Sequence, residues 1–243
     1  MTFAWLATQF TPQAPVFWLI VGLLITALLL SLQDYTPPRW RTRLWFAHWL
    51  LIPYLGLLTG GLSPRLLGLA NIDWLASLGL GLGLLFGIVA LLVLGRAVVD
   101  LGDPAVTPNA RRFFGGMTQS GWQTFGGALL WSGIEQFHWA FLRGGLHETL
   151  LTLPTPPALP GYWAIWGAAG LILAELLWSR PDLASFAIQL ATLLTTSILF
   201  FYTHNLWLCW ALHLLVHRIA GSPLGAPGTL SLSPSRMALL RRR

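Results

Sequence analysis

The chain has 243 residues, 55% of them hydrophobic and only 9% charged, which excludes an ordinary soluble domain and is typical of a polytopic membrane protein. Its formal net charge of +6 comes from arginines that gather in a few loops and in the C-terminal tail. This distribution argues against nucleic acid as a partner, because nucleic-acid binding needs a basic stripe on a soluble face. The single cysteine, Cys209, excludes a disulfide framework and a paired-cysteine metal site.

Seven segments are expected to be spanning helices, since a helix needs about 20 mainly apolar residues to cross a bilayer. No charge precedes the first segment, so it lacks the positive region of a cleavable signal peptide and is expected to remain as an anchor. The apolar stretch 183–219 is divided at Thr203, His204 and Asn205, where Thr and Asn are suited to begin a new helix. The predicted fold is an all-α bundle with about seven spans, at residues 14–32, 44–62, 75–95, 120–143, 161–179, 183–203 and 205–219.

The third segment carries glycines at four-residue spacing, namely Gly79, Gly83 and Gly87. Small residues at this spacing let the backbones of two membrane helices approach closely. We expect this glycine face to pack against another helix of the same chain.

The arginines also predict the orientation of the chain, because short cytoplasmic loops are enriched in Lys and Arg. Only Arg65 and Arg143 fall on one side of the predicted bundle. The split predicts an external N terminus and a cytoplasmic C terminus, which requires an odd number of spans. The other side holds twelve arginines: Arg39, Arg41, Arg43, Arg96, Arg111, Arg112, Arg180, Arg218, Arg236, Arg241, Arg242 and Arg243.

Two segments outside the spans have distinct compositions. The proline-rich "LPTPPALPG" at 153–161 is predicted to be a stiff external loop. Residues 221–243 combine Gly, Ser and Pro without periodicity and end in three arginines, so we expect a flexible basic cytoplasmic tail attracted to anionic lipid headgroups. The chain is thus divided into a helical membrane domain, 1–220, and a tail, 221–243.

Ionisable residues inside spans are costly, and by default they face the bundle interior and mark function. The stretch "WSGIEQFHWAFLRGG" at 131–145 places Glu135 and His138 one helical turn apart on one face. Counted from the predicted outer ends of their helices, Glu135 and His213 lie at about the same depth, roughly 12 to 14 Å. These three side chains are therefore candidates for a common site.

Other ionisable residues are expected nearer to the membrane surfaces. His48 lies near the start of the second span and His204 lies at the turn, where interfacial water is close. Glu175 lies a few residues from Arg180 near the inner face and is interpreted as structural, reaching headgroups or pairing with that arginine.

The deeper group supports two interpretations. A buried glutamate beside a histidinium or arginine can be tuned for general-base catalysis, so Glu135, His138 and His213 could polarise a water and offer donors to an oxyanion. The same residues could instead form a neutral hydrogen-bonded cluster that ties the fourth span to the seventh, a common use of intramembrane polar groups. Residue chemistry alone favours neither.

The segments "EQFHWA" followed by "FLRGG", then "FFYTH", then "HLLVH" resemble the motifs of the CAAX-protease and bacteriocin-processing (CPBP) family of glutamic intramembrane proteases, also known by its abortive-infection label. Members of that family are all-helical membrane proteins with a Glu-Glu-x-x-x-Arg motif, then Phe-x-x-x-His, then His-x-x-x-Asn near the C-terminal end. The resemblance covers roughly residues 115–220, and the first three spans match only in being hydrophobic. We expect a multi-pass protein of a prokaryotic inner or internal membrane.

The resemblance implies roles for residues of the first motif. Glu135 corresponds to the first glutamate, the general base that activates the attacking water, whereas Gln136 replaces the second glutamate. Ala140 stands in the position of the arginine, and Arg143, one turn further on a similar face, is the candidate to replace it.

The histidine motifs match in part. Phe200 and His204 fit the second motif, His213 fits the first position of the third, and His217 replaces its asparagine. Only eight residues lie between His204 and His213, whereas the family has a considerable segment there. The stretch "NLWLCWALHLLVH" therefore resembles the final family helix more than "FFYTH" resembles the second motif.

The predicted function is an intramembrane endopeptidase, or a degenerate relative that has kept the fold, acting on a membrane protein or peptide substrate. Glutamate with histidines could also hold zinc, although no His-Glu-x-x-His motif is present. The alternative is a non-catalytic membrane scaffold or assembly factor with the same fold. A transporter is a third class, but we find no inverted repeat. The catalytic candidates are Glu135, His138, His204 and His213, with Gln136, Arg143 and His217 in support.

Overall fold

Most of the described part of the chain is helical, and in this computed structural model that part comprises residues 10–101, 122–179 and 183–220. Within those ranges the structure has seven helices and no strand, and each helix corresponds to one predicted segment, so the all-α class is confirmed. The predicted tail 221–243 and the arginines Arg111, Arg112 and Arg180 lie outside the described residues. The helices are α2 (Pro15–Ser31), α3 (Pro38–Leu58), α4 (Trp74–Leu101), α6 (Trp122–Leu151), α7 (Pro160–Ser179), α8 (Leu183–Thr203) and α9 (Leu206–Ala220).

Helix boundaries follow local sequence signals. α2 and α3 begin at Pro15 and Pro38, where a missing N–H needs no partner in the first turn. The residue after α8, His204, has a φ of 46°, which ends that helix. Asn205 then begins α9, because its side-chain Oδ1 accepts the N–H groups of the second and third residues that follow it, at 3.0 and 3.2 Å.

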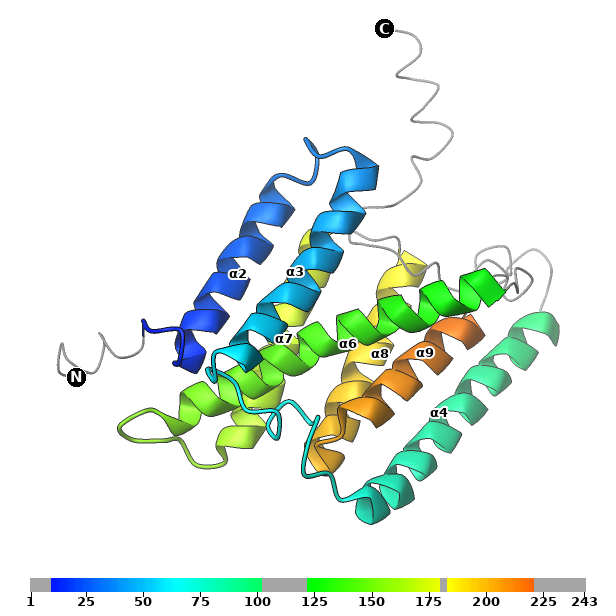
Figure 1. Cartoon of the computed structure of the whole chain (residues 1–243). Helices are drawn as coiled ribbons and strands as arrows, with labels where there is room; N and C mark the ends of the chain where they lie inside the picture. The colour runs from blue at the N-terminus through cyan, green and yellow to red at the C-terminus, as the bar shows by residue number, and fades with distance from the viewer. Residues whose placement is uncertain (1–9, 102–121, 180–182, 221–243) are drawn as a thin grey trace, which may run out of the picture.

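α6 is the central helix of the bundle (Figure 1). It contacts α2, α3, α7 and α9, and α8 packs against both α7 and α9. Buried apolar side chains such as Trp18, Trp139, Phe141 and Ile172 fill the core between α2, α3, α6 and α7. The polar residues of α6 are therefore enclosed by neighbouring helices on several sides.

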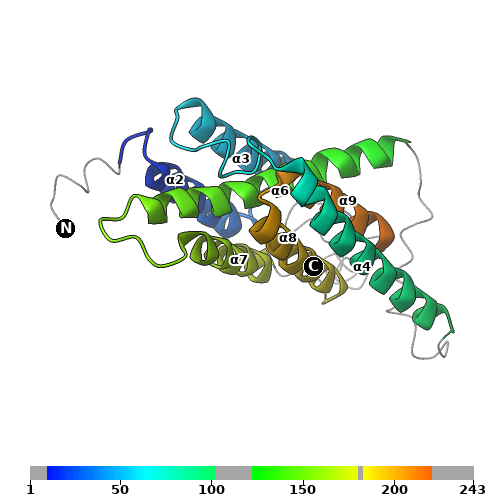
Figure 2. The ribbon, with the colours of Figure 1, turned by 90° about the horizontal axis from the view of Figure 1, so that it is seen from below.

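α4 lies at the edge of the bundle and contacts only α8 and α9 among the described helices (Figures 1 and 2). A Cβ added at Gly79, Gly83 or Gly87 would meet nothing within 4 Å. The expected packing of this glycine face against another helix of the chain is therefore wrong. α4 meets α9 through its opposite face, where a Cβ at Gly81 would lie 2.7 Å from Leu208.

Three of the described helices contain segments long and apolar enough to cross a membrane: Trp74–Leu91, Pro160–Ser179 and Ser185–Thr203. α2 is apolar but shorter, with 17 residues. α6 has 30 residues, but it carries buried polar side chains that lower its hydropathy. The three apolar helices indicate a membrane protein.

The connection between α3 and α4 fixes the ends of α6 and α9 relative to each other. Gly68 has a φ of 74°, and its carbonyl accepts the N–H of Leu206 at 3.1 Å. A Cβ at Gly68 would lie 2.7 Å from the backbone oxygen of His204, so this close approach requires glycine. In the same connection the N–H of Ser63 donates to the carboxylate of Glu148, near the end of α6, at 2.6 Å.

Candidate functional site

The carboxylate of Glu135 on α6 and the imidazole of His213 on α9 face each other in the bundle interior. Glu135 Oε2 lies 3.5 Å from His213 Nε2. The side chain of Glu135 is 5% exposed and that of His213 is fully buried. The two residues expected at the same depth thus form a buried acid–imidazole pair.

Gln136 holds the opposite edge of the same imidazole. Its side-chain Nε2 lies 2.7 Å from His213 Nδ1, and Gln136 has no exposed surface. His213 therefore contacts α6 through both ring nitrogens, one beside a carboxylate and the other beside an amide. Together these contacts set the plane and the direction of the ring.

Two further rings pack on His213. Trp139 stacks on it with ring centroids 5.2 Å apart and an interplanar angle of 30°. His217, one turn along α9, stacks on it at 4.6 Å and 26°. Neither ring nitrogen of His217 has a hydrogen-bond partner among the described residues, so this histidine contacts His213 through stacking.

His138 belongs to a second buried polar group. Its Nε2 lies 3.4 Å from Oε2 of Glu175 on α7. Its ring stacks on that of Trp49 at 5.5 Å and lies 5.4 Å from that of His48, both on α3. His48 Nε2 in turn lies 2.9 Å from the hydroxyl of Thr26 on α2. This group therefore joins α2, α3, α6 and α7.

Glu175 and His48 lie deeper in the protein than the sequence suggested. Glu175 is 7% exposed and His48 is 5% exposed, so neither reaches the surface of the bundle. The partner of Glu175 is His138, because three residues along α6 turn His138 away from α9 and toward α7. The two polar groups are neighbours, because Glu135 and His138 lie three residues apart in α6.

Arg143, the candidate replacement for the motif arginine, points toward α8. Its Nη2 donates to the hydroxyls of Thr196 and Ser197 at 3.2 and 3.1 Å. The guanidinium carbon lies 5.3 Å from the ring centroid of Phe200 and 6.0 Å from that of Trp139. Arg143 is 1% exposed, and its Nε and Nη1 have no hydrogen-bond partner among the described residues. A buried cation is thus held by neutral hydroxyls and aromatic rings.

The structure does not bring His204 to the Glu135–His213 pair. It is exposed in the turn between α8 and α9, nine residues before His213, which corresponds to roughly 13 Å along a helix. Partial burial, and then the positive charge of Arg65, lower the pKa of His204. Partial burial, and then His204, lower the pKa of His147 near the end of α6. His204 therefore belongs to a separate group of basic residues at this end of the bundle.

The described residues contain no group of three or more His, Cys, Asp or Glu side chains placed to hold a metal ion. The zinc site that a glutamate and several histidines could form therefore has no three-ligand arrangement in this part of the chain. The side chains instead form two carboxylate–imidazole pairs, Glu135–His213 and Glu175–His138. Such pairs can accept, hold and return a proton.

Two parts of this arrangement were missed from the sequence: the role of Glu175 and the hydroxyls that hold Arg143. Helical spacing carried a signal for both. Glu175 lies on the buried stripe of α7, and the hydroxyl residues lie on the buried stripe of α8, at intervals of three and four residues. These stripes comprise Ala164, Ile165, Ala168, Ala169, Ile172, Glu175, Leu176 and Ser179 in α7, and Ile188, Thr192, Leu193, Thr196, Ser197 and Phe200 in α8.

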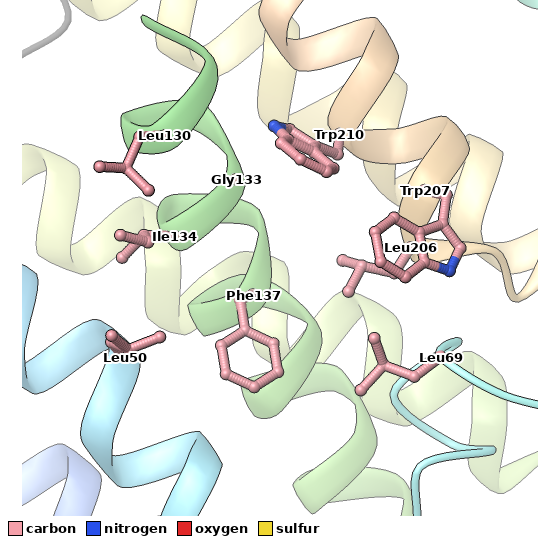
Figure 3. Close-up of a pocket in the computed structure, with 9 residues that line it drawn as sticks. All are labelled: Leu50, Leu69, Leu130, Gly133, Ile134, Phe137, Leu206, Trp207 and Trp210. Atoms are coloured by element: carbon pink, nitrogen blue, oxygen red, sulfur yellow. The ribbon is translucent and has the colours of Figure 1, made fainter. Parts of the chain in front are cut away.

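An apolar groove of about 250 Å³ opens along α6 (Figure 3). Gly133 and Phe137 of α6 line its floor, with Leu50 of α3 on one side and Trp207 and Trp210 of α9 on the other. None of the polar residues of the two pairs lines this groove. The groove and the Glu135–His213 pair therefore lie on different sides of α6.

In comparisons with known proteins, no protein-family model, no curated protein and no solved structure matches this chain. The fold and the site define a class: an all-helical membrane protein with a glutamate–histidine pair buried between two of its helices.

Proposed function

We propose that this chain is a membrane endopeptidase in which Glu135 activates a water molecule, as its resemblance to the glutamic intramembrane proteases implies. The contact between Glu135 on α6 and His213 on α9 carries this proposal. The two residues come from the first and the third of the resembling motifs, which are far apart in the sequence, and the fold places them 3.5 Å apart.

In the proposed reaction the ionised Glu135 takes a proton from a water molecule, and the resulting hydroxide adds to the carbonyl carbon of a peptide bond. His213 donates a hydrogen bond to the oxyanion that forms. The C–N bond then breaks, and the proton held by Glu135 passes to the leaving amine. A general base of this kind contributes about a hundredfold to ten-thousandfold to the rate.

The proposed substrate is a membrane protein or a peptide at the membrane. We place the protein in a prokaryotic inner or internal membrane, with seven spans, an external N terminus and a cytoplasmic C terminus. Support comes from the twelve-to-two division of arginines and from the correspondence of each described helix to one apolar segment. The polar residues of α6 and α9 are buried in the bundle interior, where membrane proteins place such residues.

A second candidate function is that of a non-catalytic scaffold. It is favoured by Ala140, a fully buried residue in the position of the motif arginine, and by the complete burial of His213. In that case the Glu135–His213 and His138–Glu175 contacts serve to hold α6 against α9 and α7.

The two functions are separated by Glu135→Gln, with Glu148→Gln as the matched control. Both substitutions replace a partly or fully buried glutamate of α6 by its amide, but the carboxylate of Glu148 accepts a hydrogen bond from Ser63 in the α3–α4 connection and is not part of the Glu135–His213 pair. The measurement is quantitative mass spectrometry of protein N termini in membranes from cells that express wild type, Glu135→Gln or Glu148→Gln at matched abundance.

Cleavage by the wild-type protein would create new protein N termini that are missing from cells without it. Under the peptidase proposal, these N termini disappear with Glu135→Gln and persist with Glu148→Gln. The physical reason is that an amide keeps the shape and the hydrogen bonds of Glu135 but cannot take a proton from water. Wild-type-dependent N termini that persist with Glu135→Gln would refute the peptidase and leave the scaffold.

A further inference from the structure

His213 has a single contact at each ring nitrogen, and the two contacts differ in chemistry. Its Nδ1 is hydrogen-bonded to the side-chain nitrogen of Gln136 at 2.7 Å, whereas its Nε2 lies 3.5 Å from a carboxylate oxygen of Glu135 and has no hydrogen-bond partner among the described residues. The ring is fully buried. These two neighbours, and not solvent, therefore determine which ring nitrogen carries a proton.

We infer that Gln136 is a positioning residue that holds His213 in the tautomer with its proton on Nε2, directed at Glu135. A neutral imidazole has one donor nitrogen and one acceptor nitrogen. The nitrogen of the Gln136 amide can only donate, and it lies 2.7 Å from Nδ1, so the ring proton belongs on Nε2. Nδ1 is then the acceptor, and it requires a donor from α6, which the amide nitrogen of Gln136 supplies.

The surroundings of the ring favour the neutral form on which this inference depends. His213 is fully buried and stacks on His217. A positive charge on this ring would have to be placed in the buried interior of the bundle, which is costly. Glu135 is the only acidic side chain in contact with the ring among the described residues.

An amide at position 136 is compatible with a proton on Nε2 of His213, whereas a carboxylate is not. A carboxylate there would accept a hydrogen bond from Nδ1–H and leave a lone pair of Nε2 facing the lone pairs of Glu135. An amide can donate to Nδ1, and by turning over it can also accept from it. Gln136 can thus follow His213 if the ring exchanges tautomers while Glu135 holds a proton.

The catalytic meaning of the tautomer rests on the proposed peptidase function: with its proton on Nε2, His213 is a hydrogen-bond donor to the oxyanion and Glu135 is the base. The tautomer itself does not depend on that function. It can be measured directly by nitrogen NMR of the protein in lipid nanodiscs, because protonated and unprotonated ring nitrogens give distinct signals.

The signal of His213 can be assigned without changing it. Only His147 and His213 follow a leucine, so a sample with carbonyl-labelled leucine and nitrogen-labelled histidine selects these two residues. The substitution His147→Asn, which lies outside the site, removes the second signal, so the remaining signal is that of His213. At neutral pH we expect a protonated Nε2 and an unprotonated Nδ1. A protonated Nδ1 with an unprotonated Nε2, or an imidazolium, would overturn the inference.

Two substitutions test whether Gln136 causes this state. Gln136→Glu is expected to move the proton to Nδ1, and Gln136→Met, which keeps a similar volume without a donor, is expected to give a mixture of the two tautomers. An unchanged proton on Nε2 in both folded variants would show that Gln136 does not set the tautomer. If the tautomer shifts as expected and no peptide cleavage is found in any form, the inference about Gln136 stands and the peptidase proposal fails.

Discussion

His138 Nε2 on α6 and Glu175 Oε2 on α7 lie 3.4 Å apart, on a different side of α6 from the contact between Glu135 and His213. One helix thus carries two acid–imidazole pairs within a single turn, each completed by a different neighbour. Inside a bundle such contacts cannot be exchanged for solvent, so breaking either pair leaves a buried polar group without a partner.

Glu175→Ala is expected to destabilise the protein by about 1–3 kcal/mol, because it leaves His138 Nε2 buried and unpaired. Glu175→Gln is expected to cost less, since its amide can still pair with the imidazole. Thermal unfolding in detergent measures both, with Leu177→Ala, an exposed position of the same helix, as the control. Equal stability of Glu175→Ala and the control would show that the contact does not hold α6 to α7.

Gly133→Ala is expected to destabilise the packing of α6 against α9 by about 1–3 kcal/mol. A Cβ at Gly133 would lie 2.9 Å from the ring of Trp210, which cannot move aside easily because its Nε1 donates to Leu129 O at 3.0 Å and to Ser132 Oγ at 3.1 Å. The measurement is the free energy of unfolding from denaturant titration in detergent.

The matched control is Gly127→Ala, six residues earlier in α6, where a Cβ meets nothing within 4 Å. Replacing glycine by alanine in an open helical position is expected to stabilise by up to about 1 kcal/mol. A loss of stability in both variants would show that the packing of Trp210 is not the cause.

The sequence predicted the helices because the chain marks them with local signals. Proline at the start of α2 and α3, and Asn205 at the start of α9, act through their own backbone or their nearest neighbours. It also predicted that Glu135 and His213 lie at one depth, because residue counts along a helix measure distance along its axis.

Residue counts could not predict which neighbour each polar side chain meets. The sequence groups His138 with Glu135 because both lie on one broad face of α6, but three residues of helix leave an angle of about 60° between the two side chains, and His138 meets Glu175 of α7. The prediction that the glycine face of α4 packs against another helix is wrong for the same reason. Residue spacing identifies a face, but the packing of whole helices decides whether that face is covered.

The end of the bundle near the turn between α8 and α9 is expected to lose stability on acidification. The pKa values of His147 and His204 are lowered in the folded protein, so the unfolded chain binds more protons below its own histidine pKa of about 6.5. The stability contributed by these neutral histidines is present above that pH and is lost as the pH falls through it. The measurement is the melting temperature between pH 8 and pH 5, which is expected to fall as the pH is lowered.

Glu148 acts in the opposite direction, because burial raises its pKa in spite of the hydrogen bond from Ser63. The histidine contribution is therefore isolated by comparing wild type with the double variant His147→Gln, His204→Gln. The double variant is expected to lose less stability between pH 7 and pH 5. An identical pH dependence in the two proteins would show that these histidines are not its source.

A reporter fused after Arg243 is expected to report the cytoplasm, and one inserted in the 153–161 loop is expected to report the opposite side. The reason is that the loops assigned to the cytoplasm hold twelve of the fourteen arginines. Paired fluorescent and phosphatase fusions measure both positions in the same cells. The reverse pair of results would contradict the proposed orientation, and two cytoplasmic results would contradict the odd number of spans.

Arg143→Met is expected to leave the melting temperature unchanged or to raise it. Arg143 is a buried cation whose polar partners are two hydroxyls, and removing a buried charge in favour of an apolar side chain of similar length is often neutral or stabilising. The hydroxyl of Thr196 keeps a contact with Leu193 O at 3.3 Å, so it does not become unpaired. Arg143→Ala, which leaves a cavity between Trp139 and Phe200, is expected to be less stable.

Arg143→Met is also expected to abolish cleavage, measured as the loss of the protein N termini that are found only in cells with the wild-type protein. A charged side chain buried in the interior of a membrane bundle indicates a functional role, and Arg143 packs on Trp139, whose ring stacks on His213. Arg143→Met removes that charge from the site while keeping the packing, whereas a purely structural arginine would show its effect in the melting temperature. A stable Arg143→Met protein with unchanged cleavage would remove Arg143 from the proposed mechanism and leave the Glu135–His213 pair to act alone.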